Sequence, residues 1–173
     1  MSDYWGGTVA NGNAFRSVKT FSRPADTTAY AAGDVIGASG TSGATLQLPL
    51  VGPVGGVALI SACRLRMSGT ALPSGIGAFR LHLFSASPAS AADNAAFVTT
   101  AGEMPSYIDY IDIPAPELIG GNFIARTVSY VGIPFQLVSS SLWAELVTVN
   151  AFTPVSAASF EVHLVGVGLG LQS

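Results

Sequence analysis

The residues best suited to chemistry in this sequence are its two histidines, His82 and His163, and a carboxylate close to one of them. Each histidine lies in a run with strand-like alternation, and Glu161 lies on the same side of its run as His163. If the two strands were neighbours, the three side chains would form a two-histidine, one-carboxylate metal site. The simpler interpretation, which we favour, is that both histidines are half-exposed strand residues without a ligand.

Other patterns typical of catalysis or cofactor binding lack an essential part. The string Gly37-Ala38-Ser39-Gly40 does not have the spacing of a serine-hydrolase nucleophile turn. Asp109 and Asp112 have opposite parity on one expected strand, so they converge on a cation or a substrate only if a bulge intervenes. Cys63 is the single cysteine, which excludes an intrachain disulfide and a cysteine-rich zinc site. We therefore predict no catalytic residue, no metal and no cofactor, and a protein that is not an enzyme.

Tyr4 and Trp5 are the residues that most suggest binding. They lie in a Gly- and Asn-rich lead-in, residues 1–14, which has no strand pattern and is expected to form an extended N-terminal arm. Exposed aromatic residues are common anchors of protein interfaces. Two interpretations stay open, namely that the two rings dock on a partner or that they pack back onto the same chain.

The low content of charge is the most unusual property of the composition. Charged residues make up 10% of the chain, whereas globular proteins average about 25%, and Lys19 is the only lysine. Because a free monomer needs a charged surface to stay soluble, we expect much of this surface to be covered by other molecules. The net charge of −3 and the scattered basic residues argue against nucleic acid as a partner. No apolar run has the length of a membrane helix, and the first residues do not have the pattern of a secretory signal, so we expect no membrane partner.

The rest of the sequence is typical of an all-β domain, with short β-branched and aromatic runs separated by Gly, Pro, Ser and Asn. We expect residues 15–173 to form a single antiparallel β-sandwich, jelly-roll-like, with at most a short helical turn near 89–97. Glycines inside the last strand, Gly166 among them, indicate close approach of another backbone. Strands are expected at 16–22, 35–37, 44–50, 57–67, 78–85, 107–113, 123–131, 135–139, 142–149 and 159–171. The alternation predicts inward side chains at Leu59, Leu65, Phe79, Leu81, Leu83, Leu146 and Val162.

Several segments, taken in their order along the chain, resemble small virion structural proteins of tailed bacteriophages. The segments are Arg23 to Ile36, Ala62 to Gly69, Phe79 to Phe84, Asp93 to Phe97, Ala151 to Pro154 and Phe160 to Leu164. The resemblance implies a capsid decoration (cement) protein, made in the host cytoplasm and placed on the capsid surface of the virion. Its implied partner is the major capsid protein. The charge-poor surface in addition predicts association with further copies of itself, and we expect a homotrimer because shells offer threefold sites. The family supplies no catalytic residues.

Two alternative functions remain open. One is a structural protein of the phage tail or neck. The other is a receptor- or carbohydrate-binding sandwich, for which Tyr107, Tyr110 and Asp109 would have to begin the site.

Overall fold

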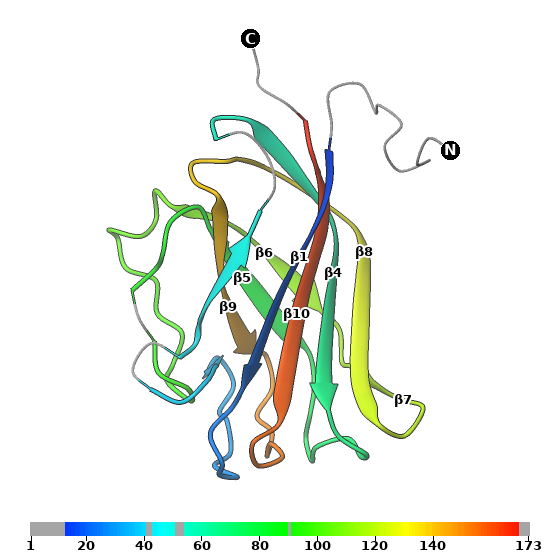
Figure 1. The fold of residues 1–173 in the computed structure, drawn as a ribbon. Helices are drawn as coiled ribbons and strands as arrows, with labels where there is room; N and C mark the ends of the chain where they lie inside the picture. Colours follow the sequence, from blue (N-terminus) through cyan, green and yellow to red (C-terminus); the bar gives the residue numbers. More distant parts are fainter. Residues whose placement is uncertain (1–12, 41–42, 51–53, 90, 170–173) are drawn as a thin grey trace.

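The computed structural model describes residues 13–40, 43–50, 54–89 and 91–169, which form two antiparallel sheets packed face to face (Figure 1). The first sheet has the order β1 (Asn13–Ser22), β10 (Ser159–Gly168), β4 (Val57–Ser68), β8 (Phe123–Gln136) and β7 (Glu117–Ile119). The second has the order β2 (Val35–Ile36), β9 (Ser141–Thr148), β5 (Phe79–Phe84) and β6 (Tyr107–Ile113), and β3 (Thr45–Pro49) also pairs with β9. The predicted all-β antiparallel sandwich is confirmed.

Alternation along the strands explains why the two sheets bury their facing sides. In β5, Phe79, Leu81 and Leu83 point into the sandwich, and Leu146 of β9 and Val162 of β10 meet them there. Leu65 of β4 is buried as well, so six of the seven predicted inward side chains lie in one continuous core.

Leu59 is the exception, and the prediction that it points inward is wrong. The pairing of β4 with β10 shifts at Ser61, where one extra residue forms a β-bulge. The bulge reverses the parity of the preceding residues, because a slip of one residue sends every side chain to the other face. Ala58 and Ile60 therefore enter the core, whereas Leu59 is only partly buried.

β8, the other neighbour of β4 in the first sheet, continues through residues 132–134, where the sequence pattern predicts a break between two strands. It pairs with β4 on both sides of an irregularity, with Ser129 opposite Ala62 and Ile133 opposite Ile60. The intervening residues Tyr130 and Gly132 have φ angles of 62° and 69°. One long strand with an outward bend thus replaces the two predicted strands.

Gly166 lies where the prediction of a close backbone approach is confirmed. A Cβ atom at this position would collide with the carbonyl oxygen of Leu59 and with the ring of Phe15. The absence of a side chain lets the Phe15 ring of β1 pack directly on β10 and close this end of the core.

The first and last described strands, β1 and β10, pair with each other along one edge of the first sheet. Asn13 of β1 pairs with Gly168 of β10, so the first and last described strands have their outer ends side by side (Figure 1). Asn13 and Ala14, which the sequence pattern assigns to the N-terminal arm, already belong to β1.

No long helix is found in the described residues. Within the described part of 89–97, where the sequence pattern allows a short helical turn, Asp93 and Asn94 form a turn. Among the described residues, no helix has the length and apolarity needed to cross a membrane.

Candidate interaction surfaces

The two histidines lie in different sheets, His82 on β5 and His163 on β10. In the described part of the chain, no three His, Cys, Asp or Glu side chains come together as a metal site would require. His163 instead joins two neighbours on the outer face of its sheet: its Nδ1 accepts a hydrogen bond from Nη2 of Arg16 (2.8 Å), and its Nε2 contacts Glu161 Oε1. The contacts with His163 and with Arg66 hold the pKa of Glu161 below its usual value.

Asp109 and Asp112 are both exposed on β6, the edge strand of the second sheet, and they do not share a ligand site. Asp112 forms a salt bridge with Nε of Arg80 (2.9 Å), its cross-strand neighbour. Asp109 accepts a hydrogen bond from the backbone N–H of Tyr110 (2.8 Å) and makes no salt bridge within the described residues. Among the described residues, Asp109 therefore has no cationic partner.

A buried polar cluster joins two segments that are far apart in the sequence, residues 23–37 and Asp93. The side chain of Arg23 is inaccessible to solvent and donates from Nε to the hydroxyl of Tyr30 (3.1 Å) and from Nη2 to Asp26 (2.9 Å). The Tyr30 hydroxyl donates to Asp93 (2.6 Å), which also accepts the backbone N–H of Gly37 (2.8 Å). Burial and the bond to Asp93 raise the pKa of Tyr30. The cluster fixes the chain after β1 to the chain after β5, which is a structural role.

A second buried pair of titratable groups lies on the outer face of the second sheet. His82 of β5 and Glu145 of β9 are cross-strand neighbours, and the ring of Phe97 stacks on His82 with 4.0 Å between centroids. Burial is the main cause that lowers the pKa of His82 to about 4, with a further contribution from Arg80. Burial also raises the pKa of Glu145 to about 7, reinforced by the charge of Glu103. In the folded chain, both side chains are therefore uncharged at a pH between about 4 and about 7.

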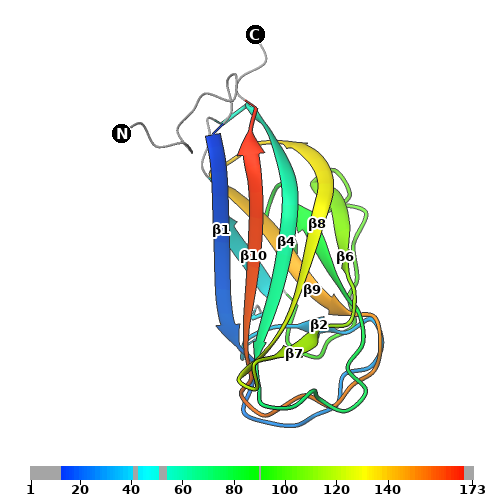
Figure 2. The same ribbon diagram turned by 90° about the vertical axis from the view of Figure 1, so that its right-hand side faces the viewer.

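The outer face of the first sheet collects basic side chains that are far apart in the sequence. Arg16 comes from β1, and Arg64 and Arg66 come from β4, while β10 between them carries Glu161. Figure 2 shows β1, β10, β4 and β8 side by side on this face. Arg66 pairs with Glu161 (3.1 Å), but Arg16 and Arg64 form no salt bridge within the described residues. We call the part of this face around Arg16 and Arg64 the basic face.

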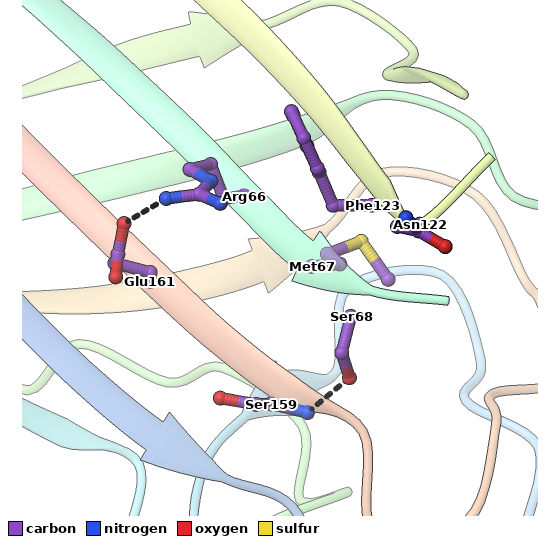
Figure 3. A pocket seen from close by; sticks show the side chains of 7 residues that line it. All are labelled: Arg66, Met67, Ser68, Asn122, Phe123, Ser159 and Glu161. Carbon is purple, nitrogen blue, oxygen red and sulfur yellow. Dashed lines mark hydrogen bonds and ion pairs between the residues drawn. The ribbon is translucent and has the colours of Figure 1, made fainter. Parts of the chain in front are cut away.

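A shallow pocket of about 350 Å³ lies at one end of the same sheet (Figure 3). The guanidinium of Arg66 lies over the ring of Phe123, 4.7 Å from its centroid, and bonds to Glu161 on the other side. Nearby, the N–H of Ser159 donates to Ser68 Oγ (2.9 Å). Because one guanidinium here faces one carboxylate, the lining of the pocket has no net formal charge.

A groove of about 260 Å³ runs along the side of the sandwich, between β6 of one sheet and β8 of the other. We call it the side groove. Tyr130, at the bend of β8, is 98% exposed, and it has a left-handed φ that an ordinary side chain rarely adopts. Residues held in such conformations cluster at binding sites. The groove is lined by Asp109, Tyr110, Ile111, Asp112, Val128, Ser129, Tyr130, Val131 and Ile133.

The sequence does not predict several of the candidate binding residues on these surfaces. Tyr4 and Trp5 lie outside the described residues, so their role stays a prediction. Tyr130 has a weak signal in the sequence, since Gly132 interrupts a strand pattern and such a glycine often marks a bulge. The basic face has no signal in the spacing of its residues, because only the sheet order brings β1 and β4 to either side of β10.

Comparisons with known proteins do not assign a family. Neither the scan against protein-family models nor the search of curated proteins found a match. Among solved structures, one similar chain belongs to a structure described as "Cyanophage Pam1 capsid asymmetric unit". The two sequences are 15% identical, the similarity covers 93% of this chain and 89% of that chain, and the TM-score is 0.37. A similarity at this level identifies neither a family nor a function.

Proposed function

We propose that this chain is a structural protein of a bacteriophage virion, and more specifically a capsid decoration protein that stabilises the head by binding across capsomers. It acts without catalysis, cofactor or metal, on the capsid surface, where its partners are the major capsid protein and further copies of itself, most simply as a homotrimer. The ordered segments that resemble small phage virion proteins support this proposal, and Arg23, Tyr30 and Asp93 from two of them meet in one buried cluster.

The observation that carries the proposal is a surface with little available charge. Arg23 and Glu145 are buried, and three of the remaining arginines, Arg66, Arg80 and Arg126, are already paired with carboxylates. The same surface exposes large apolar side chains, among them Tyr130, Val98, Val54, Met104 and Val138. A subunit covered by its neighbours in a shell needs few solvated charges, because it contributes apolar area to interfaces.

We also propose that the sandwich is of the jelly-roll type, and its strand order supports this. The chain passes repeatedly from one sheet to the other, so that β1 lies beside β10 and β4 beside β8, while β9 and β5 are neighbours in the second sheet. This exchange between two sheets is how two Greek keys build a jelly roll.

The experiment that tests the proposed function examines phage particles with and without the protein. Cryo-electron microscopy of complete particles is expected to show the sandwich on the head, bridging adjacent capsomers. Particles from a deletion mutant should open at lower temperature or after milder osmotic shock, and the gene supplied in trans should restore resistance. Density on the tail or neck, or unchanged resistance of the deletion particles, would refute the decoration role.

One observation favours the receptor- or carbohydrate-binding alternative. Tyr110 and Tyr130 line the side groove together with Asp109, a combination of aromatic rings and a carboxylate that suits a sugar. In that case the purified protein would bind cell-surface saccharides, and deletion particles would keep their stability but adsorb poorly to host cells.

A further inference from the structure

Two surfaces of this chain carry opposite charges that the described residues leave unsatisfied. On the basic face, Arg16 is exposed and its guanidinium contacts Nδ1 of His163 but forms no salt bridge with a carboxylate of the described residues, while Arg64 makes no hydrogen bond or salt bridge to the described residues. Val18 and Val165, 38% and 39% exposed, lie on the same face because Arg16 pairs with Val165 across the sheet and Val18 with His163. Arginine beside exposed apolar side chains is the composition of a protein interface.

The side groove has the chemistry that receives a guanidinium. Inside the chain itself, Arg80 lies over the ring of Tyr110 (4.2 Å to the centroid) and bonds to Asp112. The groove repeats the same two components without a cation, since Asp109 has no salt bridge to the described residues and the ring of Tyr130 is almost fully exposed. Arginine is the cation that both pairs with a carboxylate and stacks on an aromatic ring.

We propose that the basic face of one copy docks on the side groove of a second copy, with Arg16 and Arg64 directed at Asp109 and Tyr130. The two surfaces are different patches of one chain, so the contact is head-to-tail, and such contacts close into rings when the rotation permits. A homotrimer needs two distinct complementary patches of this kind. The inference rests on the self-association proposed above and names the surfaces that produce it.

The complementarity explains two features that the fold does not require. Tyr130 keeps a bulky side chain at a left-handed φ, where glycine would be less strained, because its ring is needed in the contact. Arg16 and Arg64 remain on a face with one carboxylate, in a chain whose net charge is negative.

Sedimentation velocity of the full-length chain and of charge-reversal variants tests this arrangement. Arg16→Glu combined with Arg64→Glu, or Asp109→Arg alone, should weaken self-association at least about tenfold, since each places like charges across the contact. Combining all three substitutions restores opposite charges and should recover part of the loss. Lys19→Glu is the matched control for Arg16→Glu, because it makes the same charge change on the same strand but on the other side of β1. Circular dichroism verifies that every variant folds.

The outcomes separate this inference from the proposed function. If the wild-type chain is oligomeric and the variants associate as tightly as it does, the interface is wrong while self-association stands. A wild-type chain that stays monomeric at its highest soluble concentration overturns both the interface and the homotrimer, whereas the presence of the protein on heads is decided by the particles alone. Tyr130→Asn tests whether a saccharide, rather than a second copy of the chain, binds in the side groove. If this substitution abolishes binding on a glycan array and leaves the oligomer intact, the groove is a saccharide site and the proposed interface is wrong.

Discussion

His82 and Glu145 should exchange one proton when the chain folds, so that their contributions to the pH dependence of stability cancel at mildly acidic pH, although each of them destabilises the folded chain there. The structure buries both side chains on neighbouring strands, with the pKa of His82 lowered from 6.5 to about 4 and that of Glu145 raised from 4.5 to about 7. Between about pH 4.5 and 6.5 the folded chain therefore holds the proton on Glu145, and the unfolded chain holds it on His82. Since both states bind one proton, this pair makes no contribution to the pH dependence of unfolding there.

Single substitutions should reveal the opposite pH dependences of the two groups. A pKa difference of one corresponds to about 1.4 kcal/mol, so each group alone accounts for about 3 kcal/mol. The raised pKa of Glu145 means that its destabilising effect is absent below pH 4.5 and complete above pH 7. Relative to wild type, Glu145→Gln should therefore gain about 3 kcal/mol of unfolding free energy as the pH rises from 4.5 to 7.

His82→Gln should show the reverse trend. Because the pKa of His82 is lowered by burial, the wild-type chain loses stability as the pH falls from 6.5 to 4. The variant does not lose this stability, so its unfolding free energy relative to wild type should increase by about 3 kcal/mol as the pH falls from 6.5 to 4. Urea unfolding across this range measures both differences, with Glu117→Gln on the exposed strand β7 as a control that should change by less than about 1 kcal/mol.

The reasoning would be refuted by a direct observation of the wrong protonation states. The pH dependence of the unfolding free energy reports only the total number of protons that the two side chains bind. An ion pair between charged His82 and charged Glu145 also binds one proton, so it would give the same pH dependence. Nuclear magnetic resonance of the two side chains at pH 5.5 distinguishes the cases. A neutral imidazole and a protonated carboxyl are expected, and a charged His82 ring would show that burial does not control this pair.

Three further predictions concern the core and the bend of β8. Arg23→Met should lower the unfolding free energy by about 3–5 kcal/mol, because it leaves buried polar partners uncompensated, whereas Asp26→Asn at the exposed end of the same cluster should cost less than about 1 kcal/mol in urea unfolding. Tyr130→Gly should stabilise the fold by about 1 kcal/mol, because glycine adopts the left-handed φ of this position without strain. Ser129→Gly, the neighbouring control, should destabilise the fold by about 0.5–1 kcal/mol. Equal effects of the two substitutions would show that the backbone at Tyr130 is not strained. Burial raises the pKa of the Cys63 thiol to about 12, so Ellman's reagent at pH 8 should label it only as fast as the chain unfolds; immediate labelling would show an open core.

The fold follows from the sequence where one face of a strand is clearly apolar. Phe79, Leu81 and Leu83 alternate with polar or amphipathic residues, and only one register buries them. Leu59 is followed by the equally apolar Ile60, so the pattern fits two registers, and the bulge at Ser61 that decides between them leaves no mark in the alternation. The wrong assignment of Leu59 is the result of that ambiguity.

The candidate surfaces are less accessible to sequence reasoning because they depend on strand order. Arg16 and Arg64 flank β10, which is the last of the described strands, and nothing in their spacing indicates this. The same holds for the side groove, where Asp109 and Tyr130 come from different sheets. Spacing predicts which residues share a strand face, whereas the pairing of distant strands decides which faces adjoin.

The pairing of Asn13 with Gly168 determines how the molecule responds to mechanical load. Tension applied through the two outer ends of β1 and β10 would peel these strands apart, breaking one residue pair after another from Asn13 and Gly168 toward Ser22 and Ser159. Such unzipping resists little force, because each step breaks only the bonds at the fork. Tension entering through the broad faces instead loads many strand pairs at once. If the chain has the decoration role proposed above, it should therefore hold the shell through the body of the sandwich rather than through the outer ends of β1 and β10.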